Sequence, residues 1–320
     1  MSPNGDNSAI TNDIVVHKES LSKSGSKKRR IWDFTEKISE GLLFISAFIG
    51  VVTVILIFLF LFKEAIPLLM DTTASKTLAS KNWYPISNPP VFGLVPLIAG
   101  SIIVTFGAIV ISVPLGVGAA IYLSMVASPT VREILKPAIE VLAGIPSVVV
   151  GFFGMAVLAP LIKNLFHLPT GLTALTGAIT LALMALPTIT SISEDAISTV
   201  PRRYMEASLS LGATRWQAIR TVIVPAALSG ITAATMLGIG RAIGETMTVL
   251  MVTGNAGIIP DSFLVPVRTM TATIAAEMGE VARGSDHYYA LFVVGAVLFL
   301  MTFVINLVAD IVSRRMKEVE

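Results

Sequence analysis

Long runs of apolar residues, separated by short segments that carry charge, dominate this chain. Residues Gly41–Phe62 contain no charged side chain, and no charge occurs between Lys81 and Arg132. A helix of about 20 apolar residues is long enough to cross a hydrocarbon core of about 30 Å. The pattern therefore predicts an all-α integral membrane protein of about six transmembrane helices, near Gly41–Phe62, Gly93–Ser124, Pro137–Leu161, Thr170–Ser191, Val222–Val252 and Tyr289–Ala309.

Polar segments flank these runs at both ends of the chain. Residues 1–36 are rich in Ser, Asn and Lys, a composition that cannot bury a core, so we expect a disordered basic cytoplasmic tail there. A cleaved signal peptide is the alternative for the first apolar run. The run is too long for one, and charged Lys63 and Glu64 follow it instead of small residues. The expected organisation is the tail, then residues 37–91 with the first helix and an extracytoplasmic loop, a transmembrane domain over 92–312, and a cytoplasmic C-terminal tail over 313–320.

Charge adds orientation to this picture. Only 14% of the residues are charged and 54% are hydrophobic, whereas a soluble domain has about 25% charged residues. With both termini in the cytoplasm, most of the 23 Lys and Arg residues fall on the inner side, as the positive-inside rule requires. The net charge of +2 does not suggest nucleic-acid binding, and the absence of cysteine excludes a disulfide framework or a thiolate metal site.

The cytoplasmic segment 201–225, between the fourth and fifth apolar runs, has the pattern of a helix, a turn and a second helix. Pro201 suits the start of a helix, and Gly212 suits a helix end because glycine tolerates positive φ. Thr214 followed by Gln217 forms a capping box for the second helix. By these signals alone, the helical hairpin and an ordinary cytoplasmic loop are about equally supported.

The spacing within this segment resembles the EAA loop of ABC importer permeases. Glu206-Ala207-Ser208, then Gly212, then Val222, Val224 and Pro225 keep the family spacing, with Ser in place of the third Ala position and Val in place of Ile and Leu. The resemblance implies the type I permease fold and a short coupling helix that docks on a separate cytoplasmic ATPase. The residues expected to make that contact are Glu206, Ala207, Gly212, Thr214, Arg215 and Trp216.

Two intramembrane strings resemble the phosphate-specific transport permeases. They are Gly144–Gly154 (GIPSVVVGFFG) and Gly240–Val249 (GRAIGETMTV), and the Met-Thr-Val that follows Glu-Thr favours the PstC type over the PstA type. The resemblance covers roughly residues 92–312. It implies as partners a second, PstA-like permease subunit, two PstB-like ATPase subunits and an extracytoplasmic, PstS-like phosphate-binding protein. The chain has no G-x-x-x-x-G-K-[ST] motif, so no cofactor is expected on it, and ATP and Mg²⁺ would be used by the ATPase partner.

Arg241 and Glu245 need a specific explanation, because an ionised side chain within a bilayer costs about 2.5 to 3.5 kcal/mol on insertion scales. Their spacing of four predicts one helix face and an ion pair. The pair could simply neutralise itself. Alternatively, Arg241 presents its planar fork of donors to a phosphate oxyanion, while Glu245 holds it when the pathway is empty. Thr246 and Ser147 are further candidates for the substrate pathway.

Three alternative functions remain open from the sequence. The EAA loop does not specify cargo, so a permease for molybdate or sulfate is the nearest one. An ion-coupled secondary transporter is a second, and a membrane scaffold that reports phosphate status is a third. The extracytoplasmic loop 253–286 could dock a binding protein or merely cover the pathway, and its acidic residues read as ordinary solvated charges. His17, His167 and His287 are scattered and suggest no metal site.

Overall fold

The computed structural model describes residues 7–71 and 74–317, and the side chains of residues 39–71, 76–308, 310 and 311. Five helical stretches are long and apolar enough to cross a membrane, and a sixth is a bent pair of helices. This confirms the helical membrane fold and the count of about six spans. The spans are Ser39–Met70, Val95–Val126, Ser147–Leu165, Ala174–Ser198, the pair Arg215–Ala226 and Leu228–Gly244, and Asp286–Val308.

The chain forms two units, residues 1–60 and residues 61–320. Helix α1 (Asn7–Met70) supplies the whole described part of the first unit. The helix includes residues 7–36 of the segment for which the sequence predicts a disordered tail, and its first proline is Pro67. Residues 1–6 lie outside the described part of the chain.

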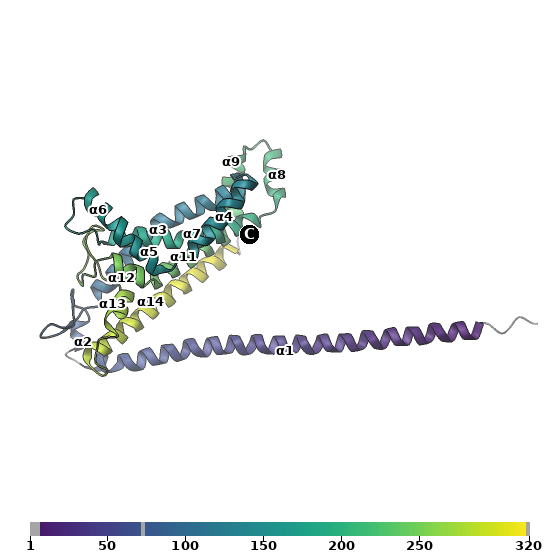
Figure 1. The fold of residues 1–320 in the computed structure, drawn as a ribbon, viewed down its shortest axis with the longest axis horizontal. Coiled ribbons are helices and arrows are strands. Elements are labelled where there is room, and N and C mark those ends of the chain that lie inside the picture. The colour runs from purple at the N-terminus through teal and green to yellow at the C-terminus, as the bar shows by residue number, and fades with distance from the viewer. Residues whose placement is uncertain (1–6, 72–73, 318–320) are drawn as a thin grey trace, which may run out of the picture. The chain divides into compact units, whose positions relative to one another are not determined.

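The second unit, residues 61–320, is a helical bundle with a small hairpin at one end (Figure 1). The hairpin pairs β1 (Trp83–Tyr84) with β2 (Val91–Phe92) in antiparallel register. The helices after it are α3 (Val95–Ile121), α4 (Pro129–Ala143), α5 (Ser147–Phe153), α6 (Ala159–Leu165), α7 (Ala174–Ser198), α8 (Arg202–Ser210), α9 (Arg215–Ala218), α10 (Val224–Ala226), α11 (Leu228–Gly244), α12 (Met247–Val252), α13 (Met270–Glu277) and α14 (Asp286–Lys317), and a short α2 (Ala74–Thr77) precedes it. Single π-helical turns cover Tyr122–Val126, Gly154–Leu158 and Ile219–Ile223.

Helices α3 and α7 pack closely at the centre of this unit. A Cβ atom added to Gly107 would lie 2.7 Å from the Cβ of Ala178, and one added to Gly116 would lie 2.9 Å from a methyl group of Ile189. Small residues of this kind let membrane helices approach one another, and van der Waals contact then holds them. Helices α3 and α7 therefore form a closely packed pair within residues 61–320.

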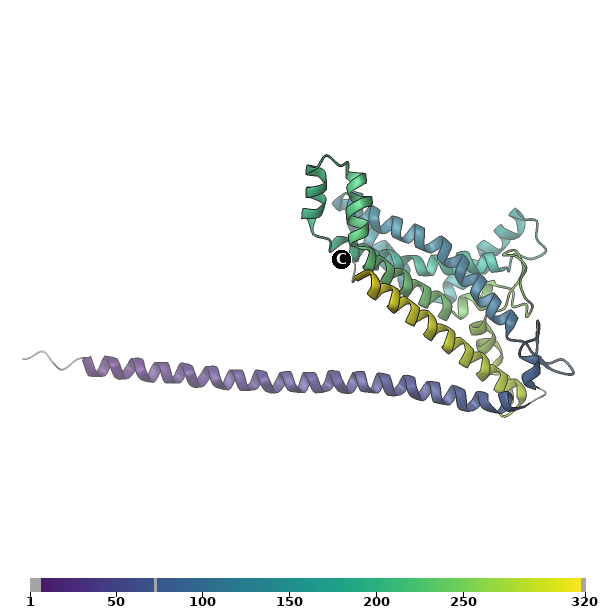
Figure 2. The same ribbon diagram turned by 180° about the vertical axis from the view of Figure 1, so that it is seen from behind.

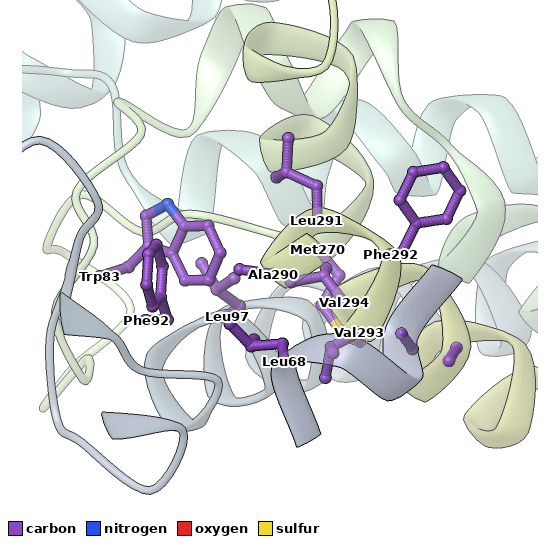
Figure 3. Close-up of a cluster of buried hydrophobic side chains, with 12 residues drawn as sticks. Leu68, Trp83, Phe92, Leu97, Met270, Ala290, Leu291, Phe292, Val293 and Val294 are labelled. Atoms are coloured by element: carbon purple, nitrogen blue, oxygen red, sulfur yellow. The ribbon is translucent and has the colours of Figure 1, made fainter. Parts of the chain in front are cut away.

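One hydrophobic cluster closes the end of the unit that carries the β hairpin. Figure 3 shows Trp83, Phe92, Leu97, Met270 and Leu291 meeting there from five separate segments, and each of them is almost fully buried. Because this cluster includes one residue from each strand, Trp83 of β1 and Phe92 of β2, the β hairpin is anchored to α3, α13 and α14.

Two of the predicted spans differ from the observed ones. The third begins at Ser147 and not at Pro137, because Gly144 ends α4 and Pro146 adopts an extended conformation (ψ 138°) before α5. The fifth is not continuous to Val252. It bends by 69° at Ala227, two residues after Pro225, and ends at Gly244. Glu245 is then extended (φ −68°, ψ 132°), and α12 starts at Met247.

Candidate functional site

The segment expected to form a helical hairpin does so. Helix α8 ends through two reverse hydrogen bonds, Ala213 N–H to Ser208 O (3.2 Å) and Gly212 N–H to Leu209 O (3.0 Å), the pattern of a Schellman motif. Gly212 has φ +87°, a conformation that side chains with a Cβ rarely adopt. The turn is therefore specified by glycine at this position.

Helix α9 begins with the predicted capping box. The Thr214 hydroxyl accepts a hydrogen bond from Gln217 N–H (3.3 Å), and Gln217 Oε1 accepts one from Thr214 N–H (2.8 Å). Two backbone N–H groups at the start of the helix are thus satisfied. These bonds fix the end of α8 and the start of α9, and Met205 of α8 packs against the same apolar cluster as Val222, which follows α9.

The hairpin presents its predicted contact residues to the surface. Its tip side chain Leu211 is 90% exposed and Trp216 is 62% exposed, so both offer apolar surface to a partner. Leu211 was not predicted, although its position directly before the turn glycine was visible in the sequence. The predicted residues, all of them exposed, are Glu206, Ala207, Gly212, Thr214, Arg215 and Trp216.

The hairpin lies at the opposite end of residues 61–320 from α2 and α13, near the C-terminal end of α14 (Figures 1 and 2). By the positive-inside rule this is the cytoplasmic end, since Arg202, Arg203 and Arg215 lie there. A small apolar cluster joins the hairpin to the bundle. In it, Ile197 of α7 packs with Ile223 and Ala227, so a force on the hairpin acts directly on the end of α7 and on the bend in the fifth span.

Arg241 lies on the last turn of α11 and lines a cavity of about 280 Å³ within the membrane region. Its Nη1 donates a hydrogen bond to Thr188 Oγ1 of α7 (3.1 Å). The other lining residues are all apolar, and they come from α4, α5, the linker between these helices, and α7: Leu142, Ile145, Val149, Val150, Phe153, Leu183 and Met184. The guanidinium is therefore the one charge among the described residues that line this cavity.

Glu245 does not pair with Arg241, and the two residues do not lie on one face of a continuous helix, as their spacing predicted. Because α11 ends at Gly244, Glu245 is turned away, and its Oε1 accepts hydrogen bonds from Thr248 N–H (3.4 Å) and Thr248 Oγ1 (3.3 Å). Its own carbonyl oxygen accepts one from Thr271 Oγ1 (2.8 Å). Glu245 lines a separate cavity of about 10 Å³, so Thr188, and not Glu245, is the observed partner of Arg241.

The two hydroxyl candidates have different environments. Ser147 starts α5, and its backbone carbonyl accepts a hydrogen bond from the buried Thr248 hydroxyl (3.1 Å). This contact ties α5 to α12 beside the Arg241 cavity. Thr246 bonds to Gly244 O (3.3 Å) and lines another cavity, of about 450 Å³, against α13 and α14. Of the four predicted pathway residues, only Arg241 lines the cavity between α5 and α7.

Sequence reasoning missed a buried charge cluster near the cytoplasmic end. The Glu194 side chain, on α7, is 1% exposed and forms ion pairs with Arg132 and Lys136 of α4. The hydrogen bond to Glu194 raises the pKa of Lys136 above its ordinary value. The spacing of Arg132 and Lys136 on one helix face was a usable signal, but the sequence analysis read these charges only as markers of topology.

A second cluster corrects the prediction for one of the outer acidic residues, Glu277, whereas Asp261 and Glu280 are exposed, as predicted. The Glu277 carboxylate is 16% exposed and accepts hydrogen bonds from Trp83 Nε1 (3.1 Å) and Arg268. It also lies 2.9 Å from His287 Nε2. These contacts connect the β hairpin, α13 and the start of α14, so Glu277 organises the extracytoplasmic end.

The bent helical bundle and its exposed cytoplasmic hairpin form the fold of the membrane-spanning permeases of ABC importers. Solved structures share this fold. The MetNI methionine ABC transporter superposes with a TM-score of 0.53 at 18% identity, over 77% of this chain and 99% of that one. A bacterial alginate ABC transporter superposes with a TM-score of 0.62 at 15% identity, over 88% and 97%.

Sequence similarity defines the family more narrowly. The chain belongs to the binding-protein-dependent transport system inner membrane components, which match residues 112–318. Similar proteins are a probable ABC transporter permease, YqgH, of Bacillus subtilis (43% identity) and the phosphate transport system permease PstC of Mesorhizobium japonicum (39% identity), each covering 75% of this chain and 78% of its own length. Membership makes the chain a multi-pass protein of the cytoplasmic membrane and implies an ATPase and a substrate-binding protein as partners.

Proposed function

We propose that this chain is one permease subunit of an ATP-driven importer of inorganic phosphate. The observation that carries the proposal is the single guanidinium of Arg241 in an otherwise apolar cavity of about 280 Å³. A desolvated oxyanion gains most from a planar, permanently charged donor that can make two parallel hydrogen bonds. The similarity to PstC permeases supports phosphate as that oxyanion.

The mechanism that fits these parts is alternating access. A PstS-like binding protein delivers phosphate at the extracytoplasmic end, and two PstB-like ATPases, with ATP and Mg²⁺, close against the cytoplasmic hairpins of this chain and of a PstA-like subunit. The hairpin passes this movement to the end of α7 through Ile197 and its neighbours. Arg241 stabilises the anion in transit, and Thr188 holds the guanidinium when the cavity is empty.

Glu245 has a different role from the one its spacing predicts. Its carboxylate accepts the Thr248 N–H at the start of α12, which fixes the break between α11 and α12. The break ends α11 three residues after Arg241, so Arg241 lies in the last turn, where carbonyl groups lack the partners that a continuing helix would supply. We therefore assign Glu245 to positioning, and Arg241 to contact with the substrate.

The test is ATP-dependent uptake of labelled phosphate, with molybdate and sulfate in parallel, in a deletion strain that carries either the wild-type gene or Arg241→Gln. We expect phosphate uptake alone to depend on the gene, and Arg241→Gln to lower it at least about 30-fold, as loss of one member of a desolvated charge pair does. Arg283→Gln removes an exposed arginine of the outer loop and serves as the matched control.

Uptake of a different oxyanion that depends on the gene would overturn the choice of cargo. Normal phosphate uptake by Arg241→Gln, at normal membrane levels, would remove Arg241 from the pathway. Uptake that persists after ATP depletion while the ion gradient is held would indicate a secondary transporter instead.

A further inference from the structure

Glu194 is a buried carboxylate with a separate cation for each of its oxygens. Oε1 bonds to Arg132 Nη2, and Oε2 lies 2.6 Å from Lys136 Nζ. Lys136 also lies 3.1 Å from Oδ1 of Asp195, but the Asp195 side chain is 63% exposed. Removing a carboxylate from water costs free energy, and partners such as these cations offset that cost. The cluster of Glu194, Arg132 and Lys136 is called the α4–α7 clamp below.

The clamp joins α4 to α7 through charged groups. Every residue of α4 is described by the structure, and none of its side chains is fully buried, so apolar burial contributes only part of what holds this helix in place. Both cations of the clamp lie on α4, four residues apart and on the same face. The position of α4 against α7 therefore depends on Glu194.

The other end of α4 leads into the wall of the Arg241 cavity. Leu142 of α4, Ile145 of the linker and Val149 of α5 line one side of the cavity, while Met184 of α7 and Arg241 line the other. Gly144 and Pro146 break the helix between α4 and α5, so the two helices meet at a bend. Moving α4 relative to α7 changes the distance between the two walls.

The clamp also lies next to the coupling hairpin along the chain. Helix α7 ends at Ser198, one turn after Glu194, and α8 begins at Arg202. A displacement of the hairpin by the ATPase therefore reaches Glu194 before it reaches the membrane interior.

We propose that Glu194 is a positioning residue for transport, whose clamp on Arg132 and Lys136 makes the α4–α5 wall of the Arg241 cavity follow the hairpin. This inference rests on the proposed alternating-access function and deepens it. The clamp is a strut between the ATPase contact and the substrate cavity. Without it, the ATPase moves the end of α7, but the cavity wall no longer moves with it.

The test uses the assembled transporter in proteoliposomes with its binding protein, and it measures phosphate uptake and ATP hydrolysis on the same samples. In Glu194→Gln we expect ATP hydrolysis to continue, while phosphate imported per ATP falls about tenfold, within the usual range of coupling between sites. Asp195→Asn is the matched control: it removes the adjacent, exposed carboxylate and should leave the ratio unchanged. Lys136→Gln, which keeps the Arg132 pair, should show a smaller fall.

If Lys136→Gln lost phosphate uptake and ATP hydrolysis to the same extent and unfolded at a lower temperature, the clamp would have only a structural role. That result would overturn the proposal. An unchanged ratio in Glu194→Gln would also overturn it. Spin labels at exposed Glu140 of α4 and Ser210 of α8 provide an independent readout. Their distance should stay fixed through the ATP cycle in wild type and become variable in Glu194→Gln. If the wild type imports another oxyanion, the cargo proposal fails, yet the ratio for that anion still tests the clamp.

Discussion

The cytoplasmic hairpin and the break after α11 both interrupt a helix, but they are stabilised in opposite ways. At the hairpin, Gly212 and the capping box of Thr214 and Gln217 bond only to residues within the same turn. At the break, the partners of Arg241 and Glu245 include Thr188 of α7 and Thr271 of α13, which lie far away in the sequence. The hairpin can therefore move as a rigid body, whereas the break changes when its neighbouring helices move.

This difference suits their proposed roles. A part that transmits a displacement must not absorb it, and the bonds within the hairpin meet that need. A part that releases an anion must change its surroundings as the helices shift, and the Arg241 cavity has walls from α4, α5, α7 and α11. Three substitutions test this contrast.

The largest effect is expected from Gly212→Val. A β-branched residue at φ +87° costs about 1 to 3 kcal/mol and redirects α9. Uptake should fall to the level of the deletion strain. The binding protein should no longer stimulate ATP hydrolysis, or the hydrolysis that it stimulates should no longer drive uptake. Gly212→Asn is the control, because asparagine tolerates this backbone region. Wild-type uptake and stimulated hydrolysis in Gly212→Val would contradict the rigid-hairpin assignment.

The same contrast explains what the sequence could predict. The span count, the orientation and the turn at Gly212 follow from apolar runs, charge bias and local capping signals, all of which can be read along the chain without knowing which segments meet in space. The prediction of an ion pair between Arg241 and Glu245 was wrong because it assumed a continuous helix. The break in that helix depends on hydrogen bonds from Thr271 and Thr248 to Glu245. The α4–α7 clamp joins residues about 60 positions apart, so no local pattern indicates which carboxylate meets which cation.

A smaller effect is expected at the break from Thr188→Val. The substitution keeps the shape of the side chain but removes the hydroxyl that accepts from Arg241. A hydrogen bond to a charged group contributes about 1.5 to 3 kcal/mol, so uptake should fall about tenfold. Initial rates over a range of phosphate-loaded binding protein will separate a change in maximal rate from a change in apparent affinity. Thr188→Ser should retain uptake, and equal loss in both variants would count against the hydroxyl.

The smallest effect is expected from Thr214→Ala at the hairpin. Loss of an N-cap side chain costs about 1 kcal/mol, and the Schellman turn at Gly212 does not depend on it. The hairpin should therefore keep its direction but fray at the start of α9. A loss of about 1 kcal/mol leaves part of the population with this turn unfolded, so uptake should fall about two- to threefold. Thr214→Ser keeps the cap and should match wild type. A loss as large as that of Gly212→Val would mean that the hairpin is no rigid body, and that its shape depends on the docked ATPase.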